Sequence, residues 1–240
     1  MVDFFREITL SIPGAQVLRS DGVVAGISGV PSPAMNSVWL QRPDPEVADV
    51  ASLLDEVAVR GVPFSLRLRP GSGTALAELA AGHGMTATGE VPLMAVDAAT
   101  DIRSPDELSI RLLAPAEATV HARLCTAGFG LPDDIARRIV TEGTLESSAV
   151  RCYVGELAGQ PVTTGLTITT GAFTGIINIT TDPRYRGRGF GAAITARAVT
   201  DGLAAGASWC WLQSSAQGYP IYKSYGFQLI ESWPTWVSQP

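Results

Sequence analysis

The sequence is poor in the residues on which several common chemistries depend. Its 240 residues include two histidines, His83 and His121, and three cysteines that lie far apart, Cys125, Cys152 and Cys210. A metal site in a protein needs such ligands in close clusters, so we expect no metal. An odd number of scattered cysteines is typical of reduced thiols in the cytoplasm and not of a disulfide framework.

Further absences narrow the class of protein. The chain has neither the Gly-x-Ser-x-Gly elbow of hydrolases nor the phosphate loop of ATPases. Its start, MVDFFREITL, lacks the basic and apolar regions of a signal peptide. The sequence also lacks a run of about 18 apolar residues, the length that spans a membrane. We therefore expect a cytoplasmic protein with no membrane partner.

Charge and composition favour a folded protein that does not bind nucleic acid. The formal net charge is −6 at pH 7, whereas a protein that binds phosphate backbones needs a basic face. Hydrophobic residues make up 46% of the chain and charged residues 17%, which is enough apolar material for a packed core. A chain of 240 residues fits one large domain or two small ones.

Turn signals divide the chain into two halves in which strands and helices alternate. The polar stretch around Pro105 predicts a linker over 99–107, between an N-terminal half over 1–98 and a C-terminal domain over 108–240. In the first half the patterns predict helices over 44–61 and 73–85 and strands over 62–69 and 88–97. In the second they predict a strand over 108–113, helices over 114–129 and 131–143, a hairpin over 149–169, a strand over 172–181, a helix over 191–206, a strand over 208–214, a short helix over 219–226 and a strand over 227–237.

The stretch DPRYRGRGFGAA, residues 182–193, follows a predicted strand and opens a helix of small residues. A helix start leaves about four backbone N–H groups without partners and carries the positive end of the helix dipole. Gly187, Gly189 and Gly191 let an anion approach the backbone. Arg186 and Arg188 add charge that suits phosphate. The stretch therefore predicts a phosphate site, and a pyrophosphate site in particular.

The same glycines fit a dinucleotide-binding fingerprint loosely, as Gly187-x-Gly189-x-x-Ala192. That fold needs an acidic residue about 20 positions further on, at the end of the next strand. Here the strand ends in Leu-Gln-Ser at 212–214, and too few residues remain for a doubly wound domain. The dinucleotide interpretation is therefore poor.

Two spaced motifs resemble those of the GNAT superfamily of N-acetyltransferases. The coenzyme A loop of that family has the pattern Arg/Gln-x-x-Gly-x-Gly/Ala, which Arg186, Gly189 and Gly191 fill here. Its second motif is a strand followed by a helix that carries Tyr and ends in Gly-Phe, which LQSSAQGYPIYKSYGF at 212–227 resembles. The resemblance covers about residues 108–240, and the order of predicted elements follows it. It implies an α/β (α+β) fold with a mixed, mostly antiparallel sheet flanked by helices.

The resemblance also implies an activity and a site. The activity is transfer of an acetyl group from acetyl-CoA, the cosubstrate, to a primary amine of a small molecule or peptide by direct attack. Pantetheine would pair with the backbone of the strand before the loop, at Ile179, Thr180 and Thr181. Pyrophosphate would rest on the amides that follow, together with the arginines: Arg186, Gly187, Arg188, Gly189, Phe190, Gly191 and Ala192. Ser215 occupies a position that commonly holds the coenzyme arm, often as Asn, and Tyr222 occupies that of an acid for the leaving sulfur.

No residue stands out as the general base. Asn178 lies in the strand where some family members carry a carboxylate, and an amide cannot usefully take a proton. Glu142 and Glu146 are more simply explained as solvated surface charges, which leaves a base acting through water open. A coenzyme A-binding or regulatory module without catalysis is therefore the alternative to the enzyme. The acceptor amine and the oligomeric state, a homodimer included, are left open.

The N-terminal half repeats part of this layout without the glycine loop. Residues 63–85 and 208–227 each give a strand, a polar turn, a short helix and then Gly before an apolar residue. The predicted helices before them, 44–61 and 191–206, also correspond. We expect a degenerate half or whole copy of the same fold that binds no coenzyme, although strand–helix layouts are common enough to coincide by chance.

Overall fold

The chain divides into two compact units. The computed structural model describes residues 9, 12–99 and 102–238. One unit comprises Met1–Leu93, Ser214–Gln217 and Leu229–Pro240, and the other Met94–Gln213 and Gly218–Gln228. The boundary between the two units falls within a strand, between Leu93 and Met94, a few residues before the linker predicted at 99–107. The C-terminal residues group with the N-terminal half, whereas the sequence placed them with the second.

The first unit is a sheet with two helices on one face. Its strands are β1 (Gln16–Ser20), β2 (Val23–Ile27), β3 (Asn36–Leu40), β4 (Ser65–Arg67), β11 (Gln228–Ser238) and most of β5 (Met85–Val96). Its helices are α2 (Val47–Ala58) and α3 (Thr74–Gly82), with a 3-10 turn, η1 (Pro33–Met35). The strands β1, β2 and β3 are antiparallel, β4 is parallel to β3, and β11 is antiparallel to β4. Alternate apolar residues of β2, β3 and β4 form one core with α2 and α3.

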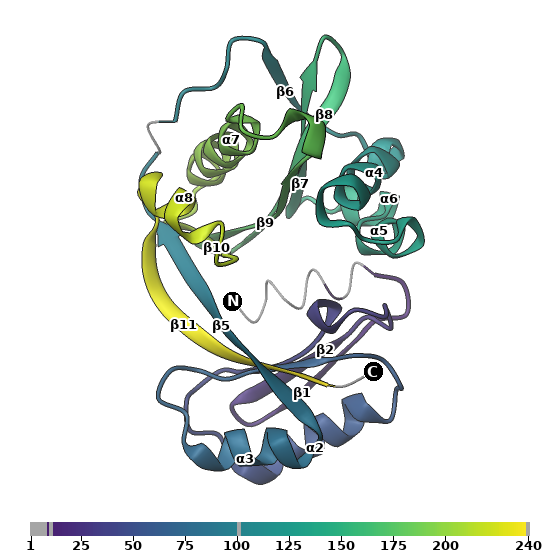
Figure 1. The fold of residues 1–240 in the computed structure, drawn as a ribbon, viewed down its shortest axis with the longest axis vertical. Helices are drawn as coiled ribbons and strands as arrows, with labels where there is room; N and C mark the ends of the chain where they lie inside the picture. The colour runs from purple at the N-terminus through teal and green to yellow at the C-terminus, as the bar shows by residue number, and fades with distance from the viewer. Residues whose placement is uncertain (1–8, 10–11, 100–101, 239–240) are drawn as a thin grey trace. The chain divides into compact units, whose positions relative to one another are not determined.

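The second unit is a sheet with helices on both faces. Its strands are β6 (Leu108–Leu112), β7 (Val150–Leu157), β8 (Gln160–Thr170), β9 (Phe173–Thr181), β10 (Trp209–Gln213) and the end of β5. Its helices are α4 (Ala118–Phe129), α5 (Asp133–Ile139), α6 (Glu142–Glu146), α7 (Phe190–Ala204) and α8 (Tyr219–Ser224), with 3-10 turns η2 (Pro115–Glu117) and η3 (Pro183–Tyr185). Antiparallel pairing runs from β6 through β9, and β10 is parallel to β9. Helices α4 and α7 both contact β8 and β9, from opposite sides (Figure 1).

The two units repeat one element order. In each, three antiparallel strands lead to a helix, a strand parallel to the third one, a short helix and a last strand. The members are β1, β2, β3, α2, β4, α3 and β5 in the first copy and β7, β8, β9, α7, β10, α8 and β11 in the second. The last strands are exchanged, because β11 pairs with β4 and β5 lies next to β10 in the strand order. The mixed, mostly antiparallel sheet and the second copy in the N-terminal half are confirmed.

The predicted elements are present with shifted ends. The helix predicted over 131–143 is present as α5 but ends early, at Ile139, and a separate helix, α6, begins at Glu142. Val140 between them is extended, and the Thr141 hydroxyl accepts a hydrogen bond from the Thr144 N–H at 3.2 Å, which starts a new helix. The predicted hairpin turn is confirmed at Ala158 and Gly159, whose φ angles of 49° and 80° suit a type I′ turn.

Candidate coenzyme site

Strands β9 and β10 pair only near the start of β9. The parallel register joins residues 173–175 to residues 209–211 and ends at Gly175 and Trp211. Strand β9 runs on to Thr181, and among the described residues its paired neighbour there is β8. The later part of β9 therefore presents a backbone edge, to which an extended ligand with amide groups can bind as a strand would.

A β-bulge lies at this split. Leu166 pairs with Ile177 and Thr164 pairs with Thr180, so β9 holds one residue more than β8 over the same stretch. Asn178, within the bulge, has a φ of 55°, a left-handed conformation that Asn adopts more readily than most residues. A bulge bends its strand and changes the direction of the backbone groups beside it. The bulge at Asn178 therefore changes the direction of the β9 backbone beyond the point where pairing with β10 ends.

The backbone groups of the three residues predicted to pair with pantetheine point in different directions. The Thr180 carbonyl accepts a hydrogen bond from Thr163 Oγ1 at 2.8 Å, so its backbone faces β8. Because backbone groups alternate in direction along a strand, those of Ile179 and Thr181 face the open edge. The Thr181 carbonyl accepts a hydrogen bond from Arg186 Nε at 3.2 Å. Ile179 is therefore the best placed of the three to bind a ligand through its backbone.

The loop after β9 leads into a helix without a side-chain cap. Gly187 and Gly189 both have a φ of 78°, where a side chain would be strained. Gly189 is the N-cap of α7, and the first intrahelical hydrogen bond runs from the Ala193 N–H to the Gly189 carbonyl at 3.0 Å. The N–H groups of residues 190–192 precede that bond and lack a partner within the helix. Together with the helix dipole, they form a site for an anion.

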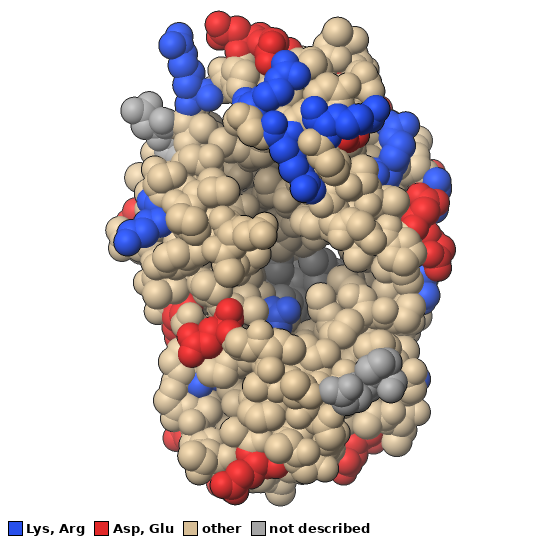
Figure 2. Space-filling model, viewed as in Figure 1, with Lys and Arg blue, Asp and Glu red and all other residues tan. Residues whose placement is uncertain are grey.

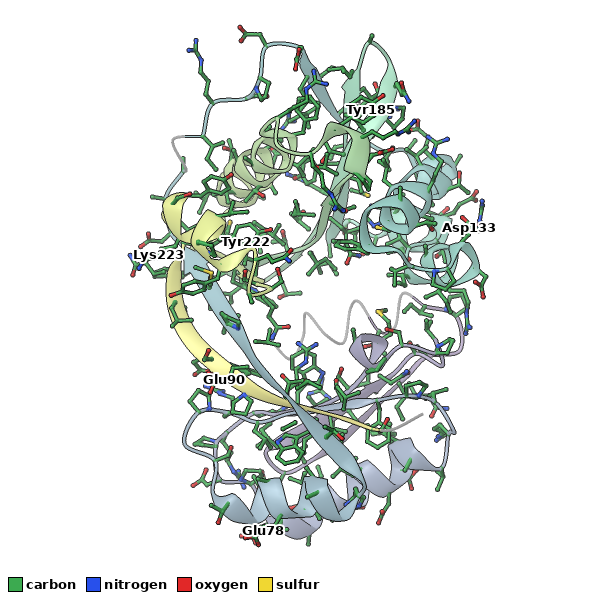
Figure 3. All side chains as sticks on the ribbon, in the orientation of Figure 1. Glu78, Glu90, Asp133, Tyr185, Tyr222 and Lys223 are labelled. Atoms are coloured by element: carbon green, nitrogen blue, oxygen red, sulfur yellow. The ribbon has the colours of Figure 1, made fainter. Side chains whose placement is uncertain are left out.

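Two buried residues fix the ends of this loop. The Asp182 carboxylate accepts hydrogen bonds from the Arg184 N–H at 3.0 Å and from Arg184 Nη2 at 2.8 Å. The same guanidinium holds the pKa of Asp182 below its usual range. Phe190, which is 1% exposed, packs against Leu108 and Val162 at the other end, near Tyr185 (Figure 3). The loop is therefore held in place before any ligand binds.

The next two arginines of the loop are exposed, and both already have partners. Arg186 Nη2 donates to the Gly128 carbonyl at 2.5 Å, in addition to its bond with Thr181. Arg188 Nη2 lies 2.6 Å from Glu107 Oε1. Figure 2 shows Lys and Arg side chains gathered over the end of the second unit that holds β6 and β8. The loop therefore carries positive charge, but the carbonyls of Thr181 and Gly128 and the carboxylate of Glu107 already bind these two exposed guanidinium groups.

Tyr222 lies on α8, next to α7 (Figure 3). Its ring meets those of Tyr225 and Phe227 edge-on, with centroids 6.4 Å and 5.7 Å away. The pKa of Tyr222 is raised to about 12, chiefly by burial and further by the neighbouring Tyr225. A hydrogen bond with Thr195 acts in the opposite direction. The Thr195 hydroxyl in turn donates to the Gly191 carbonyl at 2.9 Å. The phenol is thus protonated at neutral pH and lies beside Thr195 of α7.

Solved structures resemble this arrangement of elements over nearly the whole chain. A GCN5-related N-acetyltransferase from Kribbella flavida is 18% identical, with a TM-score of 0.72, over 98% of this chain and 92% of that one. The chain has the GNAT fold. A GCN5-related N-acetyltransferase from Sphaerobacter thermophilus is 15% identical, with a TM-score of 0.66, over 90% of this chain and 76% of that one.

A tandem GNAT protein from the clavulanic acid biosynthesis pathway is also similar. It is 13% identical, with a TM-score of 0.63, over 98% of this chain and 88% of that one. Both units therefore have counterparts in a GNAT-fold protein. No family model and no curated protein matches the sequence.

The remaining predicted residues, Ser215, Glu142 and Glu146, are exposed. Ser215 is exposed in the turn 214–217, which groups with the first unit, so its contact with the coenzyme stays a prediction. Glu142 and Glu146 are exposed on α6. Among residues 12–99 and 102–238 we find neither a group of three or more His, Cys, Asp or Glu that could hold a metal nor a helix suited to cross a membrane.

The close packing of α4 against β9 was not predicted. His121 is 1% exposed, with Nδ1 2.8 Å from Thr164 Oγ1 and Nε2 3.3 Å from Cys125 Sγ. Burial lowers the pKa of His121 to about 4. Gly128 lies one turn further along, and a Cβ there would overlap the Thr180 hydroxyl. The spacing 121, 125, 128 places these residues on one helix face, a signal that was available in the sequence.

Proposed function

We propose that this chain is an N-acetyltransferase that moves the acetyl group of acetyl-CoA to a primary amine of a small molecule or peptide. The observation that carries the proposal is the open edge of β9 followed directly by the uncapped N-terminus of α7. Coenzyme A has amide groups and a pyrophosphate in series, which match these two features in order. The GNAT fold supports it, and the three buried free cysteines support a reducing, cytoplasmic location.

The proposed reaction is a direct attack of the neutral amine nitrogen on the thioester carbonyl carbon. The N–C bond forms, negative charge develops on the carbonyl oxygen, and the C–S bond then breaks with its electron pair going to sulfur. The Ile179 N–H at the open edge is the proposed donor to the oxygen, since a fixed backbone donor is worth most where charge develops. The amine must lose a proton, and the thiolate must be stabilised.

Tyr222 serves the thiolate as a hydrogen-bond donor in this proposal. A phenol with a pKa of about 12 holds its proton more tightly than a thiol, whose ordinary pKa is about 8.5. Complete proton transfer from Tyr222 to sulfur is therefore uphill, whereas a hydrogen bond from the phenol lowers the energy of the departing charge. Water completes the protonation of sulfur.

A coenzyme A-binding module without catalysis is the second candidate. Asn178 favours it, because the side chain at the bulge is an amide and cannot accept the proton of the amine. In the enzyme, that proton leaves through water. Thiol release from acetyl-CoA, measured with a panel of amines, distinguishes the two. Release that depends on an amine supports the enzyme, and tight coenzyme binding with no release supports the module.

Gly189→Val tests the loop assignment by calorimetric titration with acetyl-CoA. The side chain blocks the approach of phosphate to the first turn of α7, so we expect at least about tenfold weaker binding. Gly206→Val is the control for backbone strain, since Gly206 has a φ of 93° in a loop that follows α7. Gly191→Ala is the control for the loop, since its Cβ would lie 3.5 Å from Thr181 Oγ1, an ordinary contact. Parent-like affinity of Gly189→Val would refute the assignment.

A further inference from the structure

A carboxylate from the segment before β6 reaches the coenzyme loop. Glu107 directly precedes β6, and its Oε1 lies 2.6 Å from Arg188 Nη2. Two residues earlier, Pro105 Cγ lies 3.8 Å from the point where Gly189 would carry a Cβ. The segment 105–107 thus lies against the loop at the residues from which α7 begins.

This ion pair holds Arg188 in a defined but accessible position. The guanidinium carbon of Arg188 lies 4.8 Å from the ring centroid of Phe190, which is buried. The side chains of Arg188 and Glu107 are 40% and 53% exposed. A bound anion can therefore reach Arg188, and it then also meets the charge of Glu107.

We propose that Glu107 competes with the phosphates of the cosubstrate for Arg188 and thereby lowers coenzyme affinity. The proposal rests on the proposed function, since it takes coenzyme A as the anion. In the free protein Glu107 neutralises Arg188. When phosphate binds at the loop, Arg188 turns to it or is shared, and the Glu107 carboxylate becomes a like charge beside a polyanion. Glu107 acts through Arg188 and is a positioning residue that makes no contact with the reacting atoms.

The size of the effect follows from exposure and distance. Exposed ion pairs change an equilibrium constant by about fivefold or less. A phosphate on Arg188 would lie within the Debye length of Glu107, about 8 Å at physiological salt, so part of the repulsion survives screening. We expect Glu107→Gln to tighten coenzyme binding about threefold, and the gain to shrink as salt rises.

A neighbouring carboxylate supplies the matched control. Asp106 is exposed and adjacent to Glu107, and we find no ion pair of it within the part of the chain that the structure describes. Asp106→Asn removes the same charge without releasing Arg188. If the effect came from net charge alone, the two variants would tighten binding equally.

The test is calorimetric titration of the full chain, the parent and both variants, with coenzyme A at about 50 mM and about 500 mM salt. We expect Glu107→Gln to bind about threefold tighter than the parent at low salt, Asp106→Asn to change less, and the difference to fall at high salt. Melting temperatures of both variants should stay close to that of the parent. Equal or weaker binding by Glu107→Gln, which a merely structural role of Glu107 predicts, overturns the proposal, as does an equal gain in Asp106→Asn.

The same titration with inorganic pyrophosphate separates this proposal from the proposed function. If the parent binds pyrophosphate but not coenzyme A, the proposed function fails, and the ratio of the Glu107→Gln and parent affinities for pyrophosphate still decides the competition. If the parent binds neither, both fail. If it binds both, the order of the three proteins should be the same with either ligand.

Discussion

Replacing Gly128 with alanine has two opposing effects on stability, a gain in helix propensity and a steric clash with β9. Gly128 lies in the last turn of α4, where alanine is ordinarily favoured over glycine by about 1 kcal/mol. Here a Cβ would overlap the Thr180 hydroxyl and lie 3.0 Å from Thr180 Cβ and 3.2 Å from its Cγ2. Rotation of the Thr180 side chain cannot relieve the clash, because its Cβ stays in place. Helix α4 or strand β9 must shift instead.

The shift outweighs the gain in propensity. Overpacking a filled site costs about 1–3 kcal/mol, so after the propensity gain of about 1 kcal/mol the free energy of unfolding falls by up to about 2 kcal/mol. Thr180 lies on the open part of β9, which makes a displaced strand also a poorer coenzyme site. Urea unfolding of the full chain measures the loss of stability, and calorimetric titration measures the loss of affinity for coenzyme A.

Two variants complete this test. Gly143→Ala lies on α6, where the Cβ would be 3.8 Å from Thr141 Oγ1, so we expect unchanged or higher stability. Gly128→Ala in a Thr180→Ala background loses the overlap with the hydroxyl, so its cost should fall by about 0.5 kcal/mol or more. A Gly128→Ala protein as stable as the parent would refute the close packing of α4 on β9.

Two further predictions concern Tyr222 and His121. Tyr222→Phe keeps the ring and removes the hydroxyl, so turnover should fall at least about tenfold while acetyl-CoA affinity and melting temperature stay near the parent values. Unchanged turnover, when chemistry limits the rate, would make Tyr222 a packing residue. His121 has a folded pKa of about 4, below its ordinary value of 6.5, so the unfolded chain binds a proton first as pH falls. The contribution of His121 to stability should therefore drop by about 3 kcal/mol between about pH 6.5 and pH 4 and then level off. His121→Gln should show a flatter profile in urea unfolding at several pH values, and parallel profiles would contradict the assignment.

The turn residues of the second unit made its fold predictable, whereas the comparable signal at the start of the chain, Asp21-Gly22 between β1 and β2, was missed. Ala158-Gly159 and the glycines of the loop mark turns that the structure contains. No strand was predicted before residue 44, yet β1, β2 and β3 lie there. Every residue of β2 and β3 is buried, so neither strand shows the alternation of a half-buried strand.

The site was predictable only in its local parts. The strand, loop and helix of 173–204 follow from neighbouring residues. The partners of the arginines do not, since Arg186 meets Gly128 58 positions earlier and Arg188 meets Glu107 81 positions earlier. Such contacts depend on tertiary packing, which periodicity and turn chemistry do not specify.

The exchange of last strands makes each copy depend on the other for its folding. Strand β11 pairs with β4 through residues 235–237, and the Ser214 N–H at the end of β10 donates to the Pro92 carbonyl of β5 at 2.9 Å. A cut at 99–107 would leave β4 without β11 in one fragment and β10 without β5 in the other. Sheet edges left open in this way promote aggregation, and unfolding of the intact chain should be a single cooperative transition. A chain without the first copy would also lack β5, the neighbour of β10 in the strand order, so the second copy is incomplete without the last strand of the first.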